Sequence, residues 1–179
     1  MLHEQLVASI KNIYEPSGLT VTSPPAEEPE GAAYGACRFA LNDRPICFRV
    51  AKITPTKNGQ FVTLWKRPES GVITPFDAAD PIDFFVVVTV DGEHSGQFIF
   101  SKDVLIAQGI VSRGGKSGKL AMRVYPPWVK TESKQAAATQ QWQIKYFLAC
   151  PPKPPLGVGW DASSGVRREV VCLLFGVVK

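Results

Sequence analysis

The stretch Phe48–Arg67, FRVAKITPTKNGQFVTLWKR, constrains the fold of this chain more than any other segment. It begins as an alternating strand and reaches a turn over Pro55–Gly59, which contains an Asn-Gly pair. Because Asn and Gly both accept positive φ angles, this pair is the strongest short signal for a β-hairpin. We therefore predict that the chain returns as a second strand over Gln60–Trp65.

Basic residues cluster on and beside this hairpin, around Trp65, the one tryptophan of the stretch. They are Arg49, Lys52, Lys57, Lys66 and Arg67. Cations around an aromatic ring on a stiff ribbon suit an anionic polymer better than a small neutral ligand. The alternative is an ordinary solvent face, because edge strands often carry lysines that block aggregation.

Length and charge limit the classes of protein to which the chain can belong. Its 179 residues predict a single domain over residues 1–179, with room for a substantial core. The net charge of +4 is too small an excess for a histone-like protein, so any affinity for nucleic acid must come from a local patch. No run approaches the roughly 18 apolar residues of a membrane span, and we expect no membrane association.

The N-terminus and the cysteines indicate a cytoplasmic protein. Met1–Leu6 has neither the basic nor the apolar region of a signal peptide. The four cysteines form no CxxC pair; they are Cys37, Cys47, Cys150 and Cys172. Only two histidines, His3 and His94, could join them as metal ligands. Reduced core thiols are therefore expected rather than a zinc site.

The hydrophobic pattern predicts an α/β (α+β) fold in which helices flank a central mixed, largely antiparallel sheet. The predicted helices are Leu2–Tyr14, Lys102–Gln108 and Gln135–Leu148, and the predicted strands are Ala33–Leu41, Ile46–Ile53, Gln60–Trp65, Phe84–Val90, Gly96–Phe100, Leu120–Tyr125 and one within Val166–Val178. Ala33–Trp65 is expected to be a three-stranded antiparallel meander. Leu19–Gly31 is expected to be a polar connection, in which Glu28 or Glu30 is either a catalytic acid or part of a solvated loop.

The segment Gly114–Lys119, GGKSGK, contains the residue types of a phosphate-binding loop but not its spacing. That loop needs G-x-x-x-x-G-K-[ST] directly before a helix, whereas Ser117 is followed by Gly118 and a predicted strand. We interpret the segment as a basic loop that adds Arg113, Lys116, Lys119 and Arg123 to the positive residues. Such a loop can follow a phosphate backbone or be a plain solvated connection.

The helix predicted over Gln135–Leu148 has a face rich in hydrogen-bonding side chains: Thr139, Gln140, Gln141, Gln143 and Lys145. Amide side chains can contact phosphates or base edges. The alternative is a plain amphipathic helix that covers the sheet with Trp142 and Phe147 inward. Trp65, Trp128 and Trp142 are accordingly candidates either for stacking on bases or for the core.

Many linked motifs in this order resemble the MepB-like family. They are RVAKITP (49–55), GQFVTLWKR (59–67), Pro75-Phe76-Asp77 with Asp80 and Asp83, GQFIF (96–100), Gly118-Lys119, RVYPPW (123–128), and Gln135-Ala136 with Thr139-Gln140 and Trp142-Gln143. The resemblance covers residues 34–147 and leaves the segment after Cys150 without a motif. It implies a fold similar to the PD-(D/E)XK, or restriction-endonuclease-like, nucleases, and nucleic-acid binding rather than a known reaction.

Nuclease chemistry of that type needs two carboxylates and a lysine that hold Mg²⁺ and orient a water molecule. The nearest match is Asp43 followed by Val50-Ala51-Lys52, in which Val50 occupies the place of the second acid. Asp77, Asp80 and Asp83 offer other carboxylates, but Gln97-Phe98-Ile99, which follows them, contains neither an acid nor a lysine. Because a site that lacks a carboxylate binds Mg²⁺ poorly, we interpret Asp43, Lys52, Asp77 and Asp83 as vestigial candidates.

The sequence therefore predicts a protein that binds DNA or RNA independently of sequence, without catalysis and without a cofactor. The expected contact residues are Arg49, Lys52, Lys57, Gln60, Lys66, Arg67, Lys119, Arg123, Trp128, Gln141 and Trp142. The main alternative is a metal-dependent nuclease with an atypical carboxylate set, for which Mg²⁺ would be the cofactor. A protein that binds a ligand or partner through a Trp-rich surface is a third hypothesis, and the oligomeric state is left open.

Overall fold

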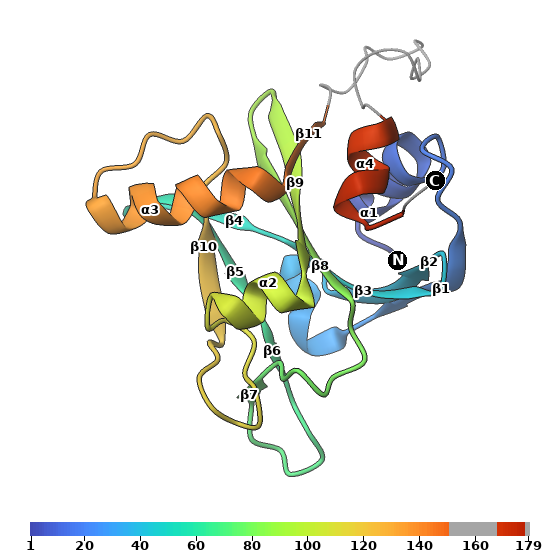
Figure 1. The fold of residues 1–179 in the computed structure, drawn as a ribbon, viewed down its shortest axis with the longest axis horizontal. Helices are drawn as coiled ribbons and strands as arrows, with labels where there is room; N and C mark the ends of the chain where they lie inside the picture. Colours follow the sequence, from blue (N-terminus) through green and yellow to red (C-terminus); the bar gives the residue numbers. More distant parts are fainter. Residues whose placement is uncertain (151–167, 178–179) are drawn as a thin grey trace.

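The computed structural model describes residues 1–150 and 168–177, which fold around a six-stranded sheet (Figure 1). Its strand order is β1-β2-β3-β8-β9-β11, with β1 at Val21–Glu27, β2 at Cys37–Leu41, β3 at Arg44–Val50, β8 at Phe84–Asp91, β9 at His94–Ser101 and β11 at Phe147–Cys150. Strands β3 and β8 are parallel, and the other neighbours are antiparallel. The prediction of a mixed, largely antiparallel sheet with flanking helices is confirmed.

Strand β8 lies at the centre of the sheet and contributes to a hydrophobic core on each face. Phe84, Val86 and Val88 belong to one core, whereas Phe85 and Val87 belong to the other. Successive side chains of a strand point to opposite faces. The continuous apolar run of β8 thus arises from burial on both sides rather than on one.

The first core lies beneath α1 (Glu4–Ser9), which continues as a π-helical segment over Ile10–Tyr14, and beneath α4 (Arg168–Leu174). The predicted N-terminal helix is therefore confirmed. The predicted strand within Val166–Val178 is wrong for the residues described there, because they form α4, and Val171 on this helix and Phe175 just after its end both pack into this core. A short run of Val, Cys, Leu and Phe fits a buried helix as well as a strand.

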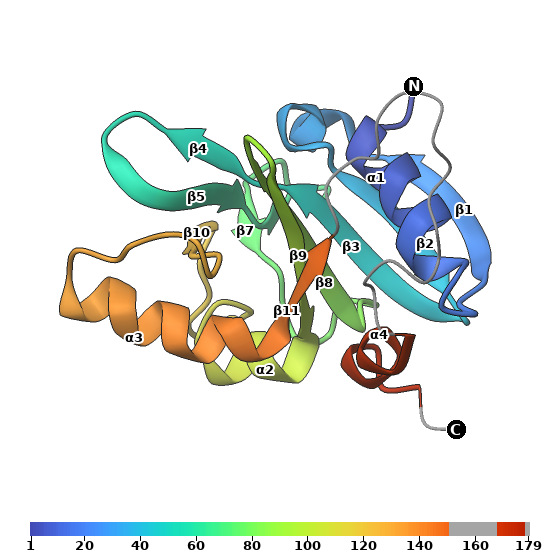
Figure 2. The same ribbon diagram turned by 90° about the horizontal axis from the view of Figure 1, so that it is seen from above.

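The second core is covered by a three-stranded sheet in the order β10-β5-β4 and by two helices. The strands are β10 (Ala121–Val124), β5 (Lys57–Thr63) and β4 (Lys52–Thr54), and the helices are α2 (Lys102–Ala107) and α3 (Lys134–Gln143). Figure 2 shows the β4–β5 hairpin and α3 extending to the same side of the molecule, with β10 between them. A two-stranded ladder, β6 (Trp65–Lys66) with β7 (Thr74–Pro75), lies beyond.

The predicted hairpin is present, but its turn is not at Asn-Gly. The chain turns at Pro55-Thr56, and Asn58 and Gly59 form a bulge inside β5, because Ile53 pairs with Gln60 whereas Thr54 pairs with Lys57. Gly59 has a φ of 77°, and an added Cβ would lie 2.7 Å from the Tyr125 ring. The glycine is therefore needed for a close approach in the bulge rather than for the turn itself.

The predicted three-stranded meander over Ala33–Trp65 is wrong beyond its first hairpin. Strands β2 and β3 do pair around a tight turn, in which Asn42 and Asp43 both have positive φ angles. Strand β3 then pairs with β8, and the chain leaves the sheet at Ala51 to form β4 and β5 elsewhere. Because β3 is buried on both faces, β8 supplies a better neighbour than the polar hairpin.

Two other boundaries differ from the predictions. The expected polar connection Leu19–Gly31 contains β1, an irregular edge strand that tolerates Pro24 and Pro25 because, in the described part of the chain, no further strand pairs beyond it. A 3₁₀ helix over Pro29–Tyr34 delays the start of β2. The helix predicted to reach Leu148 ends earlier, because a 3₁₀ turn leads into β11.

Candidate functional site

A pocket of about 610 Å³ lies where β10 and β5 meet the helices α2 and α3. Its lining contains three cationic side chains, Lys57, Lys119 and Arg123, and three aromatic side chains, Phe61, Tyr125 and Trp142. Five of the other lining residues are polar (Gln108, Ser133, Gln135, Thr139 and Gln143), and four are apolar (Ile110, Ala121, Met122 and Ala136). Among the described residues, neither Asp nor Glu contributes to the lining, so the pocket is positively charged and suited to an anion.

Strand register places part of this lining in one row. Arg123 on β10 is opposite Phe61 on β5, and Phe61 is opposite Lys52 on β4. Directly opposed residues point to the same face of a sheet. The row cation–aromatic–cation thus crosses the three-stranded sheet and ends at the pocket, while Val62 and Val124 point to the core beneath.

Arg123 holds the bulged hairpin in place. Its Nη2 donates to Thr54 Oγ1 at 2.7 Å, and its Nη1 donates to the carbonyls of Lys57, Asn58 and Gly59 at 3.3–3.4 Å. All of these acceptors are neutral. The guanidinium therefore orders the hairpin without losing its charge to a carboxylate.

Gln143 ties α3 to the strand at the rim of the pocket. Its Nε2 donates to the Arg123 carbonyl at 2.9 Å, and its Oε1 accepts the Tyr125 N–H at 2.9 Å. The side chain is fully buried. The sequence pattern placed Gln143 on a polar face that could read nucleic acid, but the residue instead acts as a structural bridge.

The edge of β10 that faces the pocket is open between these contacts. Leu64 N–H bonds to the Leu120 carbonyl, so even-numbered residues of β10 bond to β5. In an antiparallel ladder the alternate residues then point their backbone groups outward. The N–H of Ala121 and the N–H of Arg123 have no partner in the described hydrogen bonds, and both residues line the pocket.

Asp77 orders the basic loop that carries Lys119. Its carboxylate accepts from Ser112 Oγ at 2.7 Å, from the Ala79 N–H at 3.0 Å and from the Gly115 N–H at 3.3 Å. These hydrogen bonds, first among them that from Ser112, lower the pKa of Asp77 to about 2. The side chain is thus a loop anchor, and its charge is not paired with the lysines of the loop.

Several residues predicted to contact nucleic acid are engaged elsewhere. Arg49 is 4% exposed, and its Nη2 lies 2.7 Å from Glu28 Oε2, which also explains Glu28 as a structural acid. Lys66 pairs with Asp80, and Arg67 pairs with Glu30. Gln60 is buried and donates to the Val90 carbonyl at 3.2 Å. Arg49 and Gln60 are therefore not surface contacts, and the sequence offered no sign of their partners.

The other predicted contacts divide between the pocket and its surroundings. Lys57, Lys119, Arg123 and Trp142 come together in the pocket. Lys52 is exposed, with its Nζ 4.9 Å from the centre of the Tyr34 ring, and not partly buried beside an aspartate. Gln141 is exposed on α3, and Trp128 stacks on His94 at 5.2 Å, outside the lining.

The carboxylates considered for catalysis do not converge. Asp43 lies in the β2–β3 turn, Asp83 pairs with Arg44, and Asp80 pairs with Lys66. These acids therefore lie in separate local settings, and none of the described ion pairs joins one of them to Lys52. In the described part of the chain no three His, Cys, Asp or Glu side chains lie close enough together to hold a metal ion.

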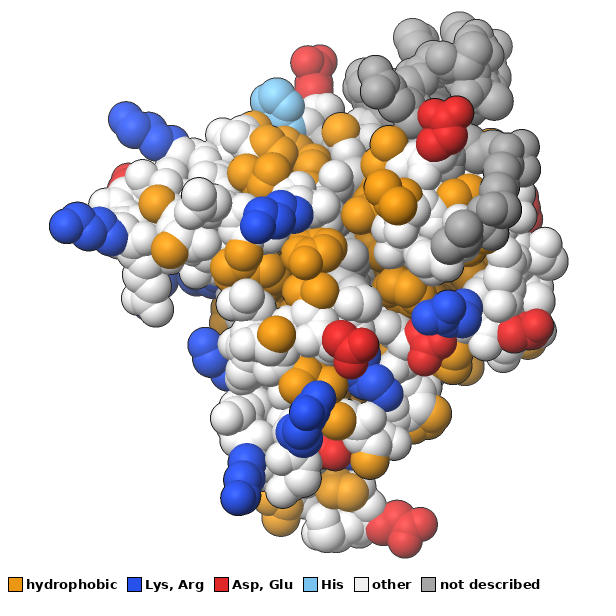
Figure 3. Space-filling model, viewed as in Figure 1, with side chains coloured by type: hydrophobic (Ala, Val, Ile, Leu, Met, Phe, Trp, Pro, Cys, Tyr) orange, Lys and Arg blue, Asp and Glu red, His pale blue; other side chains and the backbone are white. Residues whose placement is uncertain are grey.

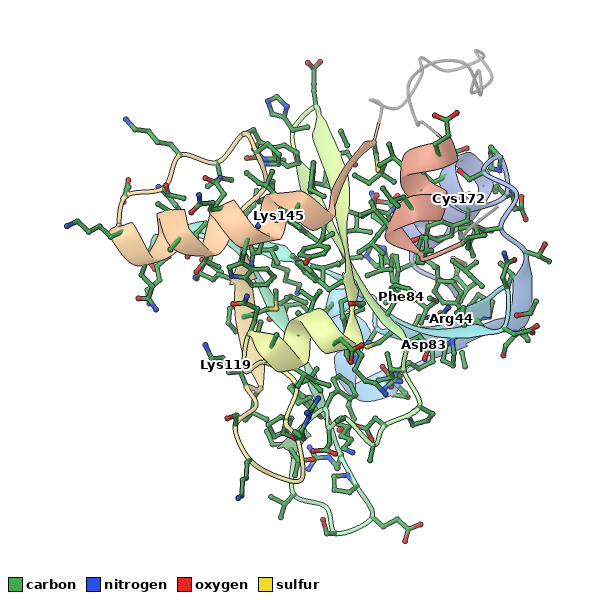
Figure 4. All side chains as sticks on the ribbon, in the orientation of Figure 1. Arg44, Asp83, Phe84, Lys119, Lys145 and Cys172 are labelled. Carbon is green, nitrogen blue, oxygen red and sulfur yellow. The ribbon has the colours of Figure 1, made fainter. Side chains whose placement is uncertain are left out.

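Charge is distributed unevenly over the surface. In Figure 3 most of the charged side chains over α3 and β10, at the left, are Lys and Arg. Figure 4 places Lys119 on this side and the Arg44–Asp83 pair on the far side of α2. Within the described ranges, no helix is long and apolar enough to cross a membrane.

Comparison with known proteins agrees with the architecture. A search of curated proteins found no match. A crystal structure of MepB matches with a TM-score of 0.71 and 33% sequence identity, over 84% of this chain and 97% of that one. The MepB-like family profile matches residues 28–149, which include the whole pocket lining. This chain belongs to the MepB-like family.

Proposed function

We propose that this protein binds DNA or RNA, independently of sequence, through the pocket at the edge of β10. The observation that supports the proposal most strongly is the absence of acidic residues from the described lining, although the lining gathers Lys57, Lys119 and Arg123 from separate segments. None of the described ion pairs includes these three residues. Uncompensated cations on a concave surface attract phosphates and release their counterions.

Catalysis is not part of this proposal. A metal-dependent cleavage site needs carboxylates grouped beside a lysine, whereas Asp77 accepts hydrogen bonds from its own loop and Asp80 and Asp83 each pair with a cation. Converting these acids into a metal site would require breaking the contacts that order the loop and the start of β8. A binding role uses the side chains where they lie.

The proposal extends to compartment and ancestry. We propose a cytoplasmic protein whose fold derives from the PD-(D/E)XK nucleases, with a sheet and helices that keep the binding face and not the metal site. The cysteines support a reducing compartment: the four thiols are free, and burial raises the pKa of Cys37 to about 11 and that of Cys150 to about 12. Such thiols stay protonated and unreactive.

The test is a binding titration of labelled DNA and RNA oligonucleotides across a series of salt concentrations, with and without Mg²⁺. Lys57→Ala and Lys119→Ala are compared with Lys11→Ala, which removes the same charge from an exposed position on the N-terminal helical segment, outside the pocket. Each lost phosphate contact should flatten the slope of log K against log salt by about 0.9 for duplex DNA and about 0.7 for a single strand.

We expect the two pocket variants to lose affinity and slope for all sequences and Lys11→Ala to behave like the wild type. If the wild type binds no oligonucleotide, or if all three variants lose affinity equally, the pocket is not a nucleic-acid site. Cleavage of the oligonucleotide that depends on Mg²⁺ would favour the nuclease hypothesis instead.

A further inference from the structure

The pocket contains more than cations, and its aromatic side chains suggest which form of nucleic acid it takes. Phe61, Tyr125 and Trp142 all line it, and each is partly exposed rather than buried. Phosphate binding alone does not need aromatic rings, because charge and N–H donors suffice. Rings at the surface of a basic pocket suit a base that offers its face.

Two of these rings pack against other aromatic side chains. Trp142 packs against Phe100 with ring centres 5.4 Å apart, and Phe61 meets Tyr34 edge to face at 6.3 Å. The Arg123 guanidinium lies 5.8 Å from the centre of the Phe61 ring. A ring that is fixed on one side and open on the other can stack on a base without losing much conformational freedom.

The dimensions of the pocket also match one nucleotide rather than a nucleic-acid duplex. A pocket of about 610 Å³ is of the size that encloses a small organic molecule. In a duplex, both faces of each base are covered by neighbouring base pairs, so the rings in the pocket would have no exposed base to contact. An unpaired nucleotide can place its base in the pocket and leave its phosphate at the rim.

The open edge of β10 adds directional donors beside the rings. The outward N–H groups of Ala121 and Arg123 lie in the same lining as Lys57 and Lys119. Backbone N–H groups and lysines are both common phosphate contacts and carry no sequence preference. The rings and the donors therefore offer separate places for a base and for a phosphate.

We propose that the pocket binds single-stranded nucleic acid, with one unpaired base against Trp142 and the phosphate of that nucleotide beside Lys57 and Lys119. This rests on the proposed function and specifies the form of its ligand. The next nucleotide follows the cross-strand row over Phe61 toward Tyr34 and Lys52, which continues the pattern of rings and cations.

The experiment compares three twelve-nucleotide probes on the wild-type protein: single-stranded oligothymidine, the same backbone with every base removed, and a duplex of equal length. The abasic strand has the same phosphates, so it isolates the contribution of the bases without altering the protein. Loss of one or more stacked bases should weaken binding by about five- to a hundredfold. The duplex should bind more weakly than the oligothymidine.

Variants locate the effect in the pocket. Trp142→Leu should lose most of the preference for the base-bearing over the abasic strand, whereas Trp128→Leu, which alters a tryptophan outside the lining, should keep the wild-type preference. If Trp142→Leu does not fold, Phe61→Leu replaces it, and the comparison of probes on the wild type stands without either variant. Thymidine monophosphate is titrated separately to test for a free nucleotide as the ligand.

Equal affinity for the base-bearing and abasic strands, with the salt dependence intact, would overturn the single-strand assignment and leave electrostatic binding standing. Monophosphate binding as tight as that of the oligonucleotide would replace the single strand by a free nucleotide. A wild type that binds none of the probes would remove the proposed function as well.

Discussion

Cations on the two sides of α2 have different environments although their local sequences look alike. At the β10 edge, Lys57, Lys119 and Arg123 belong to none of the described ion pairs. Across the molecule Arg44 at the start of β3 pairs with Asp83, and Arg49 near the end of the same strand pairs with Glu28. Figure 4 shows the separation directly, with Lys119 on one side and Arg44 beside Asp83 on the other.

This difference shows that a basic residue in a strand is informative only once its partner is known. Arg49 and Lys57 belong to the same basic stretch, yet one is a buried structural ion and the other an exposed charge. The partner of Arg49 lies 21 residues away in the sequence, just after β1. The predictions below test whether paired cations serve stability and unpaired ones serve binding.

Breaking the most buried pair should have the largest effect. Glu28→Gln keeps the shape of the side chain but removes the carboxylate that pairs with the Arg49 guanidinium, which is 4% exposed, and with the more exposed Arg38. We expect the free energy of unfolding to fall by about 3 kcal/mol, measured by urea denaturation, because a buried charge without a partner is costly. Oligonucleotide affinity of the folded protein should not change.

Glu30→Gln is the matched control, since it removes a carboxylate from an exposed ion pair two residues along the chain. The side chains of Glu30 and Arg67 are 48% and 44% exposed, so the loss should be under about 1 kcal/mol. Equal losses from the two variants would show that burial does not distinguish these pairs.

Removing the bridge between α3 and β10 should affect both stability and binding. Gln143→Leu leaves the Arg123 carbonyl and the Tyr125 N–H without their hydrogen bonds. We expect a loss of about 2 kcal/mol, because unsatisfied buried polar groups are expensive, and weaker binding as α3 shifts at the pocket. Gln141→Leu on the exposed face of the same helix should change stability by less than about 0.5 kcal/mol.

The fold was predictable from sequence where hydrophobic periodicity is strong and local. The run of β8, the N-terminal helix and the short helix α2 all follow from patterns within a few residues. Pairing partners are not predictable from local patterns, because the choice of β8 over β5 as the neighbour of β3 depends on residues almost forty positions apart. The helix α4 was mistaken for a strand because its apolar run fits either structure.

The candidate site was predictable in part for a similar reason. Lys57, Lys119, Arg123 and Trp142 were identified as exposed functional types, and the fold brings them to one pocket. The roles of Arg123 as a hairpin clamp and Gln143 as a bridge depend on contacts across 18 to 69 residues. Phe61, Tyr125 and the open edge of β10 had no distinct signal, since nothing in an alternating strand shows which edge stays unpaired.

Comparing a cation from a partly buried ion pair with an unpaired, exposed cation sharpens the comparison further. Lys66→Ala removes the partner of Asp80, whose side chain is 17% exposed, and should lower the free energy of unfolding by about 1 kcal/mol. Its salt slope for oligonucleotide binding should match the wild type. Lys57→Ala should show the opposite pattern, with a flatter slope and unchanged melting. If Lys66→Ala lost slope as well, paired cations would also contribute to binding.

The smallest expected effect concerns Asp77, an acid that lies near the basic loop without pairing with its lysines. Hydrogen bonds from Ser112 and from the Ala79 and Gly115 N–H groups lower the pKa of Asp77 to about 2, against an ordinary value of 3.8. Because the folded pKa is the lower one, the stabilisation is complete above the ordinary value and is lost as the pH falls from about 4 toward 2.

Asp77→Asn should remove this pH dependence, because the amide can still accept a hydrogen bond from Ser112 but does not ionise. The measurement is the amide chemical shift of Gly115 followed by NMR from pH 5 to pH 2, with the thermal midpoint recorded alongside. The wild-type shift should titrate near the bottom of this range, and that of Asp77→Asn should stay flat. Binding near neutral pH should differ little, since the lysines of the pocket are unpaired in either case. A wild-type midpoint near pH 4 would instead mean that the loop is not anchored by this carboxylate, and Lys119 would then owe its position to the backbone hydrogen bond from its N–H to the Ile110 carbonyl.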